Sequence, residues 1–420
     1  MTTASTQDTT RTLFCSFELG AAKWLLTFGA RGDARSVRKE IYSGDAGALT
    51  SAMKYARSRF ELPADAPVLS CYEAGRDGFF PHRLLESLGV QNIVIDPSSI
   101  LVDRRSKRVK TDRIDGNMLL ALLMRHYGAE RKEDRLKVVR VPTLQQEMNR
   151  LRDRDIKALK DERQAHRNRI KGLLALMGAC PRTCQRVPEL KNLVCWDGSP
   201  LPPEMLALLE REQERLALVE SQIRELERER QAMTRPVKAS KPKASTAAET
   251  ATTSETASTP ASISASTDVE IRDLEDEMVI CDVVIKQRTR LETLKAVGPS
   301  TSSILVNELF AWRDFRNVKE LASCTGLVGA PWQSGEVNRE QGITKAGNKL
   351  VRWALVQLAH GWLMHQPQSE LSQWYRRRFA AGSRGERKKG IVALARKLLI
   401  ALWKFVKGGE APAGAMLKAS

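Results

Sequence analysis

The sequence has few of the residues that stabilise secreted and membrane proteins. Its 420 residues include seven cysteines, an odd and widely scattered set, which argues against an extracellular disulfide scaffold and for a reducing compartment. The longest apolar runs, such as 117–124, are too short to span a bilayer, and the polar segment 1–11 lacks the apolar stretch of an export signal. We therefore expect a cytoplasmic protein that has no membrane anchor.

Acidic residues are also too few to balance the basic ones. The chain has 68 Lys and Arg against 50 Asp and Glu, a formal net charge of +18. Residues 101–172 contain 21 basic and 11 acidic side chains, and residues 339–420 contain 16 and 4, so these two segments hold the whole excess. Two separate cationic segments predict a polyanionic partner that is contacted by more than one part of the chain.

The composition divides the chain into folded parts and one linker. Residues 238–267 contain 22 Ala, Ser or Thr in 30 positions, too little apolar surface to offset the entropy lost on ordering. We assign a disordered linker to 236–267. An N-terminal domain is expected at 12–140, a helical region at 141–235, and a C-terminal domain at 268–408.

The N-terminal domain is predicted to be a mixed α/β structure. Runs typical of strands lie at 13–17, 24–28, 37–42, 68–72 and 92–96. Helical patterns occupy 45–60 and 80–88. Three leading strands followed by strand-helix-strand alternation predict a mixed sheet flanked by helices.

The rest of the chain is predicted to be mostly helical. Two charged segments with apolar residues at helical spacing, 143–177 and 203–233, predict a long antiparallel coiled coil that we expect to mediate oligomerisation. Further helices are expected at 268–296, 350–365 and 391–406.

The turn at 294–300 and the helix expected at 302–310 form a helix-hairpin-helix-like element. Such a turn can bind phosphate through its backbone amides, although a plain turn between two helices would have the same pattern.

Four carboxylates of the N-terminal domain are candidate metal ligands. Glu18 and Glu73 follow predicted strands, at the end where α/β proteins hold ligands. Asp112 and Asp115 lie three residues apart in the first turn of a predicted helix, where they could equally be acids that cap a solvated helix. Converging carboxylates need a cation, and Mg²⁺ is the expected one.

The sequence resembles transposases of the insertion sequence 110 family in several places. These are Glu18, Cys71–Gly75 (Cys-Tyr-Glu-Ala-Gly), the helix start Lys110–Asp115, Gly326–Gly335, and Ile343–Arg352. The family combines an N-terminal DEDD domain of the RuvC-like ribonuclease-H fold with a coiled coil and a second transposase domain. The resemblance implies that Glu18, Glu73, Asp112 and Asp115 form the acidic tetrad that binds Mg²⁺. The first position is usually Asp, so Glu18 departs from the family by one methylene.

Ser334 is the second candidate reactive group. It lies in the turn-rich stretch 331–335, and the residues alone favour an ordinary loop serine, because no adjacent serine-histidine-aspartate pattern is present. The resemblance implies instead that Ser334 is the nucleophile that attacks a DNA phosphate and forms a phosphoserine bond.

Several cationic and amide side chains near these groups are candidate nucleic-acid contacts. They are Lys110, Arg113, Arg339, Lys345, Asn348, Lys349 and Arg352. The i, i+4 spacing of Lys345 and Lys349, with Arg352 three residues further on, predicts one helical face that could follow a phosphate backbone or simply be solvated.

Together these features predict a DNA transposase or recombinase that cuts and rejoins the ends of an insertion sequence and its target. The resemblance adds guidance by a noncoding bridge RNA and assembly as a dimer or tetramer. Two alternatives stay open at this point. One is a RuvC-like metal-dependent junction nuclease that hydrolyses DNA with activated water, and the other is an inactive nucleic-acid-binding relative whose metal site is weakened by Glu18.

Overall fold

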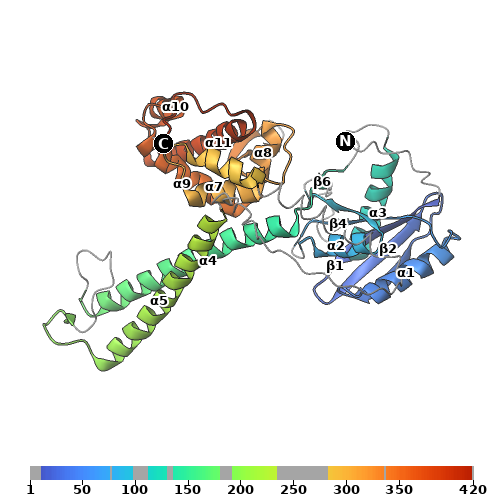
Figure 1. Cartoon of the computed structure of the whole chain (residues 1–420), viewed down its shortest axis with the longest axis horizontal. Coiled ribbons are helices and arrows are strands. Elements are labelled where there is room, and N and C mark those ends of the chain that lie inside the picture. The colour runs from blue at the N-terminus through green and yellow to red at the C-terminus, as the bar shows by residue number, and fades with distance from the viewer. Residues whose placement is uncertain are drawn as a thin grey trace, which may run out of the picture. The chain divides into compact units, whose positions relative to one another are not determined.

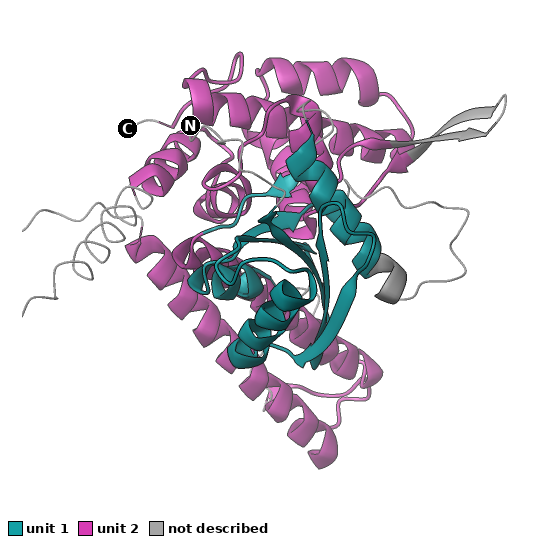
Figure 2. Cartoon of the chain, turned by 90° about the vertical axis from the view of Figure 1, so that its right-hand side faces the viewer, with its two compact units in different colours: residues 1–142 teal, residues 143–420 magenta. Residues whose placement is uncertain are grey.

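The chain forms two compact units, residues 1–142 and residues 143–420 (Figure 2). The computed structural model describes residues 11–75, 78–97, 112–129, 136–179, 192–233, 282–334 and 337–418, without the side chains of 112–115 and 330–341. The predicted linker at 236–267 lies outside this described part. The expected class, mixed α/β together with a larger helical portion, is confirmed.

The first unit is built on a six-stranded mixed sheet. Its strands are β1 (Leu13–Leu19), β2 (Lys23–Ala30), β3 (Val37–Tyr42), β4 (Val68–Glu73), β5 (Gln91–Ile95) and β6 (Val138–Val139), in the order β3-β2-β1-β4-β5-β6. β2 runs antiparallel to both of its neighbours, β1 and β3, whereas β1, β4 and β5 run parallel, and β6 closes the edge in the antiparallel sense. All five predicted strands are confirmed. β6 is only two residues long, too short to give a pattern.

Helices cover both faces of this sheet (Figure 1). The helices α1 (Ala46–Arg59) and α2 (Phe80–Ser87) pack with one set of alternate strand residues, such as Cys15 and Phe17. The helix α3 (Asp112–Gly128) packs with the other set, such as Phe14 and Cys71. Because both faces are buried, the central strands are nearly continuous apolar runs, which explains why the sequence predicted them well.

The second unit contains a long antiparallel helix pair, which we call the α4–α5 arm (Figure 1). Its helices are α4 (Leu144–Leu176) and α5 (Pro203–Ala232). Interhelical ion pairs run from Arg152–Glu229 through Lys160–Glu227 to Arg167–Glu220, so residue numbers rise along one helix as they fall along the other. Apolar side chains fill the seam between the two helices. The predicted antiparallel pairing is therefore confirmed.

The remaining helices of the second unit surround one large apolar core. They are a helical segment at 282–292, α7 (Pro299–Leu305), the π-helical turn η6 (Val306–Phe310), α8 (Val318–Thr325), α9 (Lys349–His365), α10 (Glu370–Phe379) and α11 (Arg384–Gly408). Between α8 and α9 lies a hairpin of β7 (Gly329–Ser334) and β8 (Val337–Ile343), which the sequence analysis missed. Its Gly and Pro content and its lack of apolar alternation gave no strand pattern.

The predicted helix-hairpin-helix-like element is a helix, a short turn and a second helix. The turn between the 282–292 helix and α7 includes Ala296 at a φ of 77°. The backbone N–H of Lys295 donates to the carbonyl of Met416, so the C-terminal segment already uses one amide of this turn. Phosphate binding by the turn stays a prediction.

The α4–α5 arm is joined to the C-terminal helices by buried charges. Glu308 of η6 accepts hydrogen bonds from Arg150 and Arg154 of α4 and from Asn348, with donor–acceptor distances between 2.7 and 3.2 Å. Burial would raise the pKa of Glu308, but the Arg154 hydrogen bonds and the Arg150 charge outweigh it and hold the pKa below its usual range. The described helices of the predicted regions 141–235 and 268–408 pack within the compact unit 143–420.

A second buried acid, Asp153 of α4, lies beside this cluster. It accepts hydrogen bonds from Ser303 and Asn307 at 2.8 to 2.9 Å and is 3.7 Å from Arg230 of α5. Here burial is the larger effect, and it raises the pKa of Asp153 despite these donors. The same junction thus contains two buried carboxylates whose pKa values shift in opposite directions.

We expect Glu308→Gln to lower the free energy of unfolding by about 3 kcal/mol at pH 7, because buried Arg150 loses its counter-charge. Since the folded-state pKa of Glu308 is depressed, its contribution is fully present above the unfolded-state pKa of about 4.3 and is lost as pH falls through the folded-state value. Urea unfolding at pH 7 and pH 3 should therefore show a smaller difference between wild type and variant in acid.

Asp153→Asn is the contrasting variant for the same measurement. Because the folded-state pKa of Asp153 is raised, acidification favours the folded wild type at this residue, and its advantage over the variant should grow as pH falls. A Glu308→Gln difference that also grows in acid would contradict the assigned charge state of Glu308.

Candidate functional site

Two of the predicted acids lie next to each other at one edge of the sheet. The parallel register of β1 and β4 places Phe17 opposite Tyr72, so Glu18 and Glu73 occupy the next position on each strand. Both positions are at the carboxyl ends of their strands. Glu18 is half-buried and Glu73 is exposed. The expectation that these two glutamates share a sheet edge is met.

The alternation of side chains assigns both glutamates to the face that α3 covers. Glu18 is two residues beyond Ser16, whose hydroxyl donates to the carbonyl of Gly116 in α3 at 2.7 Å. Glu73 is two residues beyond Cys71, which packs in the α3 cluster. Because alternate residues of a strand share a face, Glu18 and Glu73 follow Ser16 and Cys71.

The direction of α3 brings its first turn to the same edge. Near its start, Gly116 contacts Ser16, and near its end the ring of Tyr127 lies 6.5 Å from that of Phe14. α3 therefore runs antiparallel to β1 and begins at the carboxyl end of that strand. Asp112 and Asp115 belong to this first turn, as predicted, although their side chains lie outside the described residues.

A close backbone approach fixes where α3 begins. A Cβ atom added to Gly116 would lie 2.7 Å from the hydroxyl of Thr27, which is fully buried in β2. Only glycine permits this separation, so the Ser16–Gly116 hydrogen bond and the position of the first turn depend on it.

The two predicted cationic neighbours of the acidic tetrad are not described by the structure. Lys110 lies outside the described residues, as does the side chain of Arg113. Among the described side chains, which include Glu18 and Glu73 but not Asp112 or Asp115, no group of three or more His, Cys, Asp or Glu residues is placed to hold a metal.

Asp96 is a further acid at this sheet edge that the sequence analysis did not select. It follows β5 directly, by the same rule that singled out Glu18 and Glu73. However, Ile95 packs in the α3 cluster, so alternation assigns Asp96 to the opposite face. Asp96 therefore does not share the face assigned to Glu18 and Glu73.

Ser334 lies at the tip of the β7–β8 hairpin. It is the last residue of β7 and pairs with Val337, the first residue of β8. The turn-rich loop expected here is thus a strand end, while Arg339 pairs with Trp332 along the same hairpin. The side chains of these residues lie outside the described part of the chain.

The root of the hairpin is held by backbone hydrogen bonds. The N–H of Thr344 donates to Val328 at 2.9 Å, and the N–H of Asn348 donates to Cys324 at 2.9 Å. Gly347, at a φ of 87°, would place an added Cβ 2.3 Å from the Cys324 carbonyl oxygen. Glycine is therefore required where the chain leaving the hairpin crosses the end of α8.

The predicted cationic helix face after the hairpin is wrong. α9 begins at Lys349, with Asn348 as its N-cap, whereas Lys345 precedes the helix at a φ of 56°. Lys345 and Lys349 are exposed, but Arg352 donates to the carbonyl of Thr325 at 2.9 Å. A shared helical face would require Lys345 to lie in the helix, but the Asn348 cap begins the helix after it. Nucleic-acid contact by these residues stays a prediction.

A larger set of exposed cations lies further along, in α10 and α11. We call it the basic α10–α11 segment, and it comprises Arg376, Arg377, Arg378, Arg384, Arg387, Lys388, Lys389 and Lys397. The sequence signal for this segment is the basic excess of residues 339–420, but a charge count does not say which of the cations are exposed.

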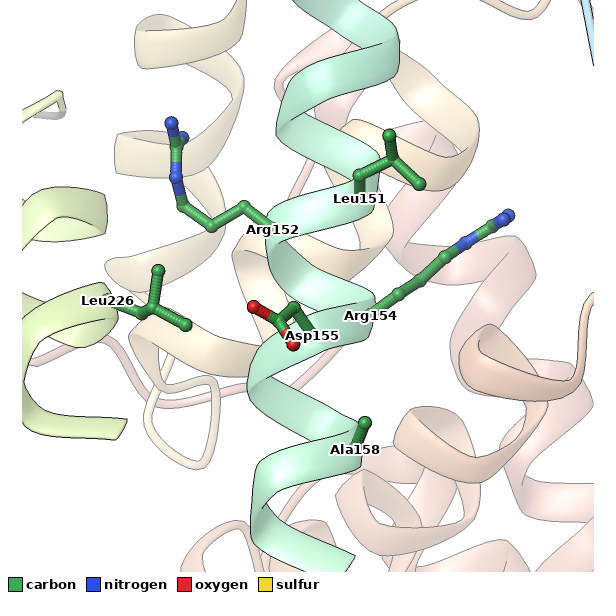
Figure 3. A pocket seen from close by; sticks show the side chains of 6 residues that line it. All are labelled: Leu151, Arg152, Arg154, Asp155, Ala158 and Leu226. Carbon is green, nitrogen blue, oxygen red and sulfur yellow. The ribbon is translucent and has the colours of Figure 1, made fainter. Parts of the chain in front are cut away.

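An open hollow of about 530 Å³ lies along the α4–α5 arm (Figure 3). Its lining residues are Leu151, Arg152, Arg154, Asp155, Ala158 and Leu226. None of the predicted site residues lines it.

Among the helices that the structure describes, none has both the length and the apolar composition needed to span a bilayer.

Comparison with known proteins identifies the class of this chain. The model of the Transposase IS116/IS110/IS902 family matches residues 288–373, which include the β7–β8 hairpin and α9. "Putative transposase y4rJ" of Sinorhizobium fredii is 37% identical over 414 residues, 97% of this chain and 94% of its own length. The transposase for insertion sequence element IS1328 of Yersinia enterocolitica is 29% identical over 87 residues, 20% of this chain and 26% of its own.

The protein is thus a transposase, a class that acts on DNA. It belongs to the IS116/IS110/IS902 family, and the resemblance found in the sequence is confirmed.

We expect Gly116→Ala to destabilise the first unit and to shift the start of α3. The added methyl group must displace buried Thr27, at a cost of about 1–3 kcal/mol for overpacking. Gly172→Ala is the matched control, because Gly172 is exposed within α4 and has open space at its Cβ position. That variant should gain up to about 1 kcal/mol from helix propensity. Thermal unfolding of both variants tests this difference. If Gly116→Ala stabilises the protein as much as Gly172→Ala does, the close approach of Gly116 to Thr27 is contradicted.

Proposed function

We propose that this transposase cuts and rejoins DNA with Ser334 as nucleophile and with Mg²⁺ held by Glu18, Glu73, Asp112 and Asp115. The observation that carries the acidic site is the pairing of Glu18 and Glu73 at the carboxyl ends of β1 and β4, on the face where α3 begins. Three separated segments thereby supply acids to one sheet edge. Ser334, at a hairpin tip inside the segment matched by the family model, supports the second part.

We further infer that the first unit has a ribonuclease-H or RuvC-like DEDD fold. This inference is supported by three antiparallel strands followed by two parallel ones, in the order β3-β2-β1-β4-β5, with α3 crossing one face. The apolar seam of the α4–α5 arm supports the proposal that this arm is a coiled coil.

The residues at the acidic edge fit a magnesium ion. Carboxylate oxygens are the ligands that Mg²⁺ prefers, and a half-buried Glu18 beside an exposed Glu73 leaves the edge open to a phosphate. Bound Mg²⁺ would supply Lewis-acid polarisation of the phosphoryl group and neutralise its charge. The protein's part is to fix its carboxylates at the strand ends, and the Ser16–Gly116 hydrogen bond orients the turn that bears the two aspartates.

The serine step is a balanced exchange of phosphodiester bonds. The Ser334 oxygen forms a bond to phosphorus and gives up its proton, while the bond from phosphorus to the deoxyribose oxygen breaks and that oxygen takes a proton. The DNA–protein bond conserves the energy of the broken one, so a second hydroxyl can rejoin the strand by the reverse step.

The proposed partners are the DNA of the element ends and target, together with a noncoding bridge RNA. The net charge of +18 and the exposed basic α10–α11 segment support polyanion binding, because cations released from phosphates drive such association. Guidance by RNA, a dimeric or tetrameric assembly and a cytoplasmic location are parts of the proposal that rest on the family resemblance and the composition.

One observation favours a second candidate function, hydrolysis of DNA junctions. All four acids of the proposed tetrad belong to the first unit, whereas Ser334 belongs to the second. An acidic site that is complete within one unit could activate water without the serine.

Ser334→Ala should abolish a covalent protein–DNA adduct while leaving DNA binding intact, because only the attacking oxygen is removed. The complex is purified from cells that contain the flanking element, its RNA is sequenced, and it is incubated with donor and target DNA and Mg²⁺. Ser323→Ala is the control, since Ser323 is an exposed serine of the neighbouring α8. Mg²⁺-dependent cuts that survive Ser334→Ala, with no adduct in wild type, would establish the hydrolytic alternative.

Glu73→Gln should reduce adduct formation by roughly a hundredfold or more at limiting Mg²⁺, because a neutral amide is a much weaker ligand for a hard cation. Raising the Mg²⁺ concentration should restore part of the rate. Glu40→Gln makes the same change on β3, where the exposed Glu40 pairs with Lys23, and should leave the rate unchanged. Equal rates for wild type and Glu73→Gln at every Mg²⁺ concentration would remove Glu73 from the site.

A further inference from the structure

We propose that Glu308 is a positioning residue that ties the root of the β7–β8 hairpin, and with it Ser334, to the α4–α5 arm. The catalytic consequence of this tie rests on the proposed function, whereas the tie itself rests on described contacts. Neither the family match nor the acidic tetrad assigns a role to Glu308.

Glu308 is a buried carboxylate whose donors come from different parts of the fold. Its side chain has no exposed surface. Arg154 donates to both carboxylate oxygens, at 2.7 and 3.1 Å, and Arg150 donates at 3.2 Å. The fourth hydrogen bond comes from the side-chain amide of Asn348 at 2.8 Å. Two donor residues therefore belong to α4, and the third follows the hairpin.

Asn348 connects this carboxylate to the hairpin root. Its side-chain oxygen accepts from the backbone N–H groups of Leu350 and Val351 and so begins α9. Its own N–H donates to Cys324, at the end of α8. Four residues earlier, Thr344 is hydrogen-bonded to Val328 across the base of the two strands. Asn348 is thus fixed on one side by Glu308 and on the other by the ends of two helices.

A second set of contacts links α4 to the same root. The guanidinium groups of Arg150 and Arg313 lie over the ring of buried Trp312, at 4.5 and 4.3 Å from its centroid. Arg313 also donates to the sulfur of Cys324 at 3.2 Å. Cys324 is the residue whose carbonyl accepts from Asn348. Two separate sets of side-chain contacts therefore join Arg150 to the hairpin root.

These contacts make the arm and the hairpin root mechanically dependent on each other. A buried carboxylate that loses a donor pays a large desolvation penalty, so Glu308 favours arrangements that keep α4 and Asn348 in place together. A displacement of α4 must either break these hydrogen bonds or move the root with it. The position of the strand that ends at Ser334 is thereby coupled to the position of the arm.

The first variant pair tests the link at the hairpin root. Asn348→Asp keeps a side-chain oxygen to cap α9 but replaces the amide donor with a carboxylate that faces Glu308. Asn317→Asp is the matched control. The side-chain oxygen of Asn317 caps α8 by accepting from the backbone N–H of Glu320, and Asn317 is exposed. Both substitutions make the same chemical change at a helix N-cap, but only Asn348→Asp places a second carboxylate against Glu308.

The second variant pair tests the link at the arm. Arg154→Ala removes two of the hydrogen bonds to Glu308. Arg152→Ala, two residues earlier on α4, removes a side chain that contacts Glu229 and Met233 instead. The two arginines leave α4 in different directions (Figure 3). Asn348→Asp and Arg154→Ala lie on separate elements, so a shared effect points to the carboxylate between them.

The readout is amide hydrogen exchange of the full chain at residues 344–348. We expect Asn348→Asp and Arg154→Ala each to speed exchange there by about tenfold. The double variant should add little more, because both substitutions break the same connection through Glu308. Asn317→Asp and Arg152→Ala should leave this segment unchanged. In the same preparations, the two test variants should form the Ser334 adduct about tenfold more slowly at saturating DNA. Arg154→Ala, which lies outside the predicted nucleic-acid contacts, should do so with unchanged DNA affinity.

The exchange and adduct readouts separate failure of the inference from failure of the proposed function. Exchange in Arg154→Ala that matches Arg152→Ala overturns the tie, whatever the adduct does. Faster exchange with an unchanged adduct rate overturns the positioning role of Glu308. Faster exchange in a protein whose wild type forms no adduct supports the tie and rejects the serine chemistry instead.

Discussion

The second unit depends on the burial of one carboxylate, Glu308, among donors that it cannot lose. A charge without exposed surface is tolerated only when its lone pairs are filled, and here the donors come from α4 and from Asn348. The apolar core can stabilise many arrangements of helices, but this constraint selects one. It determines how the arm meets the C-terminal helices and where the chain leaves the hairpin.

The first unit depends on a different constraint, the close approach of α3 to the sheet. Apolar burial alone would allow α3 to slide over β1 and β2. The hydrogen bond from Ser16 and the lack of a side chain at Gly116 fix its register. Because the acids are distributed over two strands and the first turn of this helix, that register decides whether they can act as one site.

The sequence predicted secondary structure best for strands that are buried on both faces. The central strands are apolar on both faces and were located correctly, whereas the β7–β8 hairpin has neither alternation nor a run of β-branched residues. The paired edge of Glu18 and Glu73 followed from their positions after strands, because parallel strands end together. Glu308 could not be recognised as a hub, since its partners are 154 and 158 residues away in α4 and become neighbours only on folding.

Burial also separates acids that the sequence presents as equivalent. Glu308 is enclosed, and the protein's own arginines already satisfy it, so it has neither the access nor the free charge that a metal ion requires. Glu73 is the exposed last residue of the otherwise buried strand β4, where an ion and a phosphate can reach it. An acid that is to bind Mg²⁺ must be accessible to the ion, and its charge must not already be neutralised by the protein's own cations. Glu73 has such an accessible position in the first unit, whereas the second unit uses the opposite arrangement, a buried and neutralised carboxylate, to join its elements.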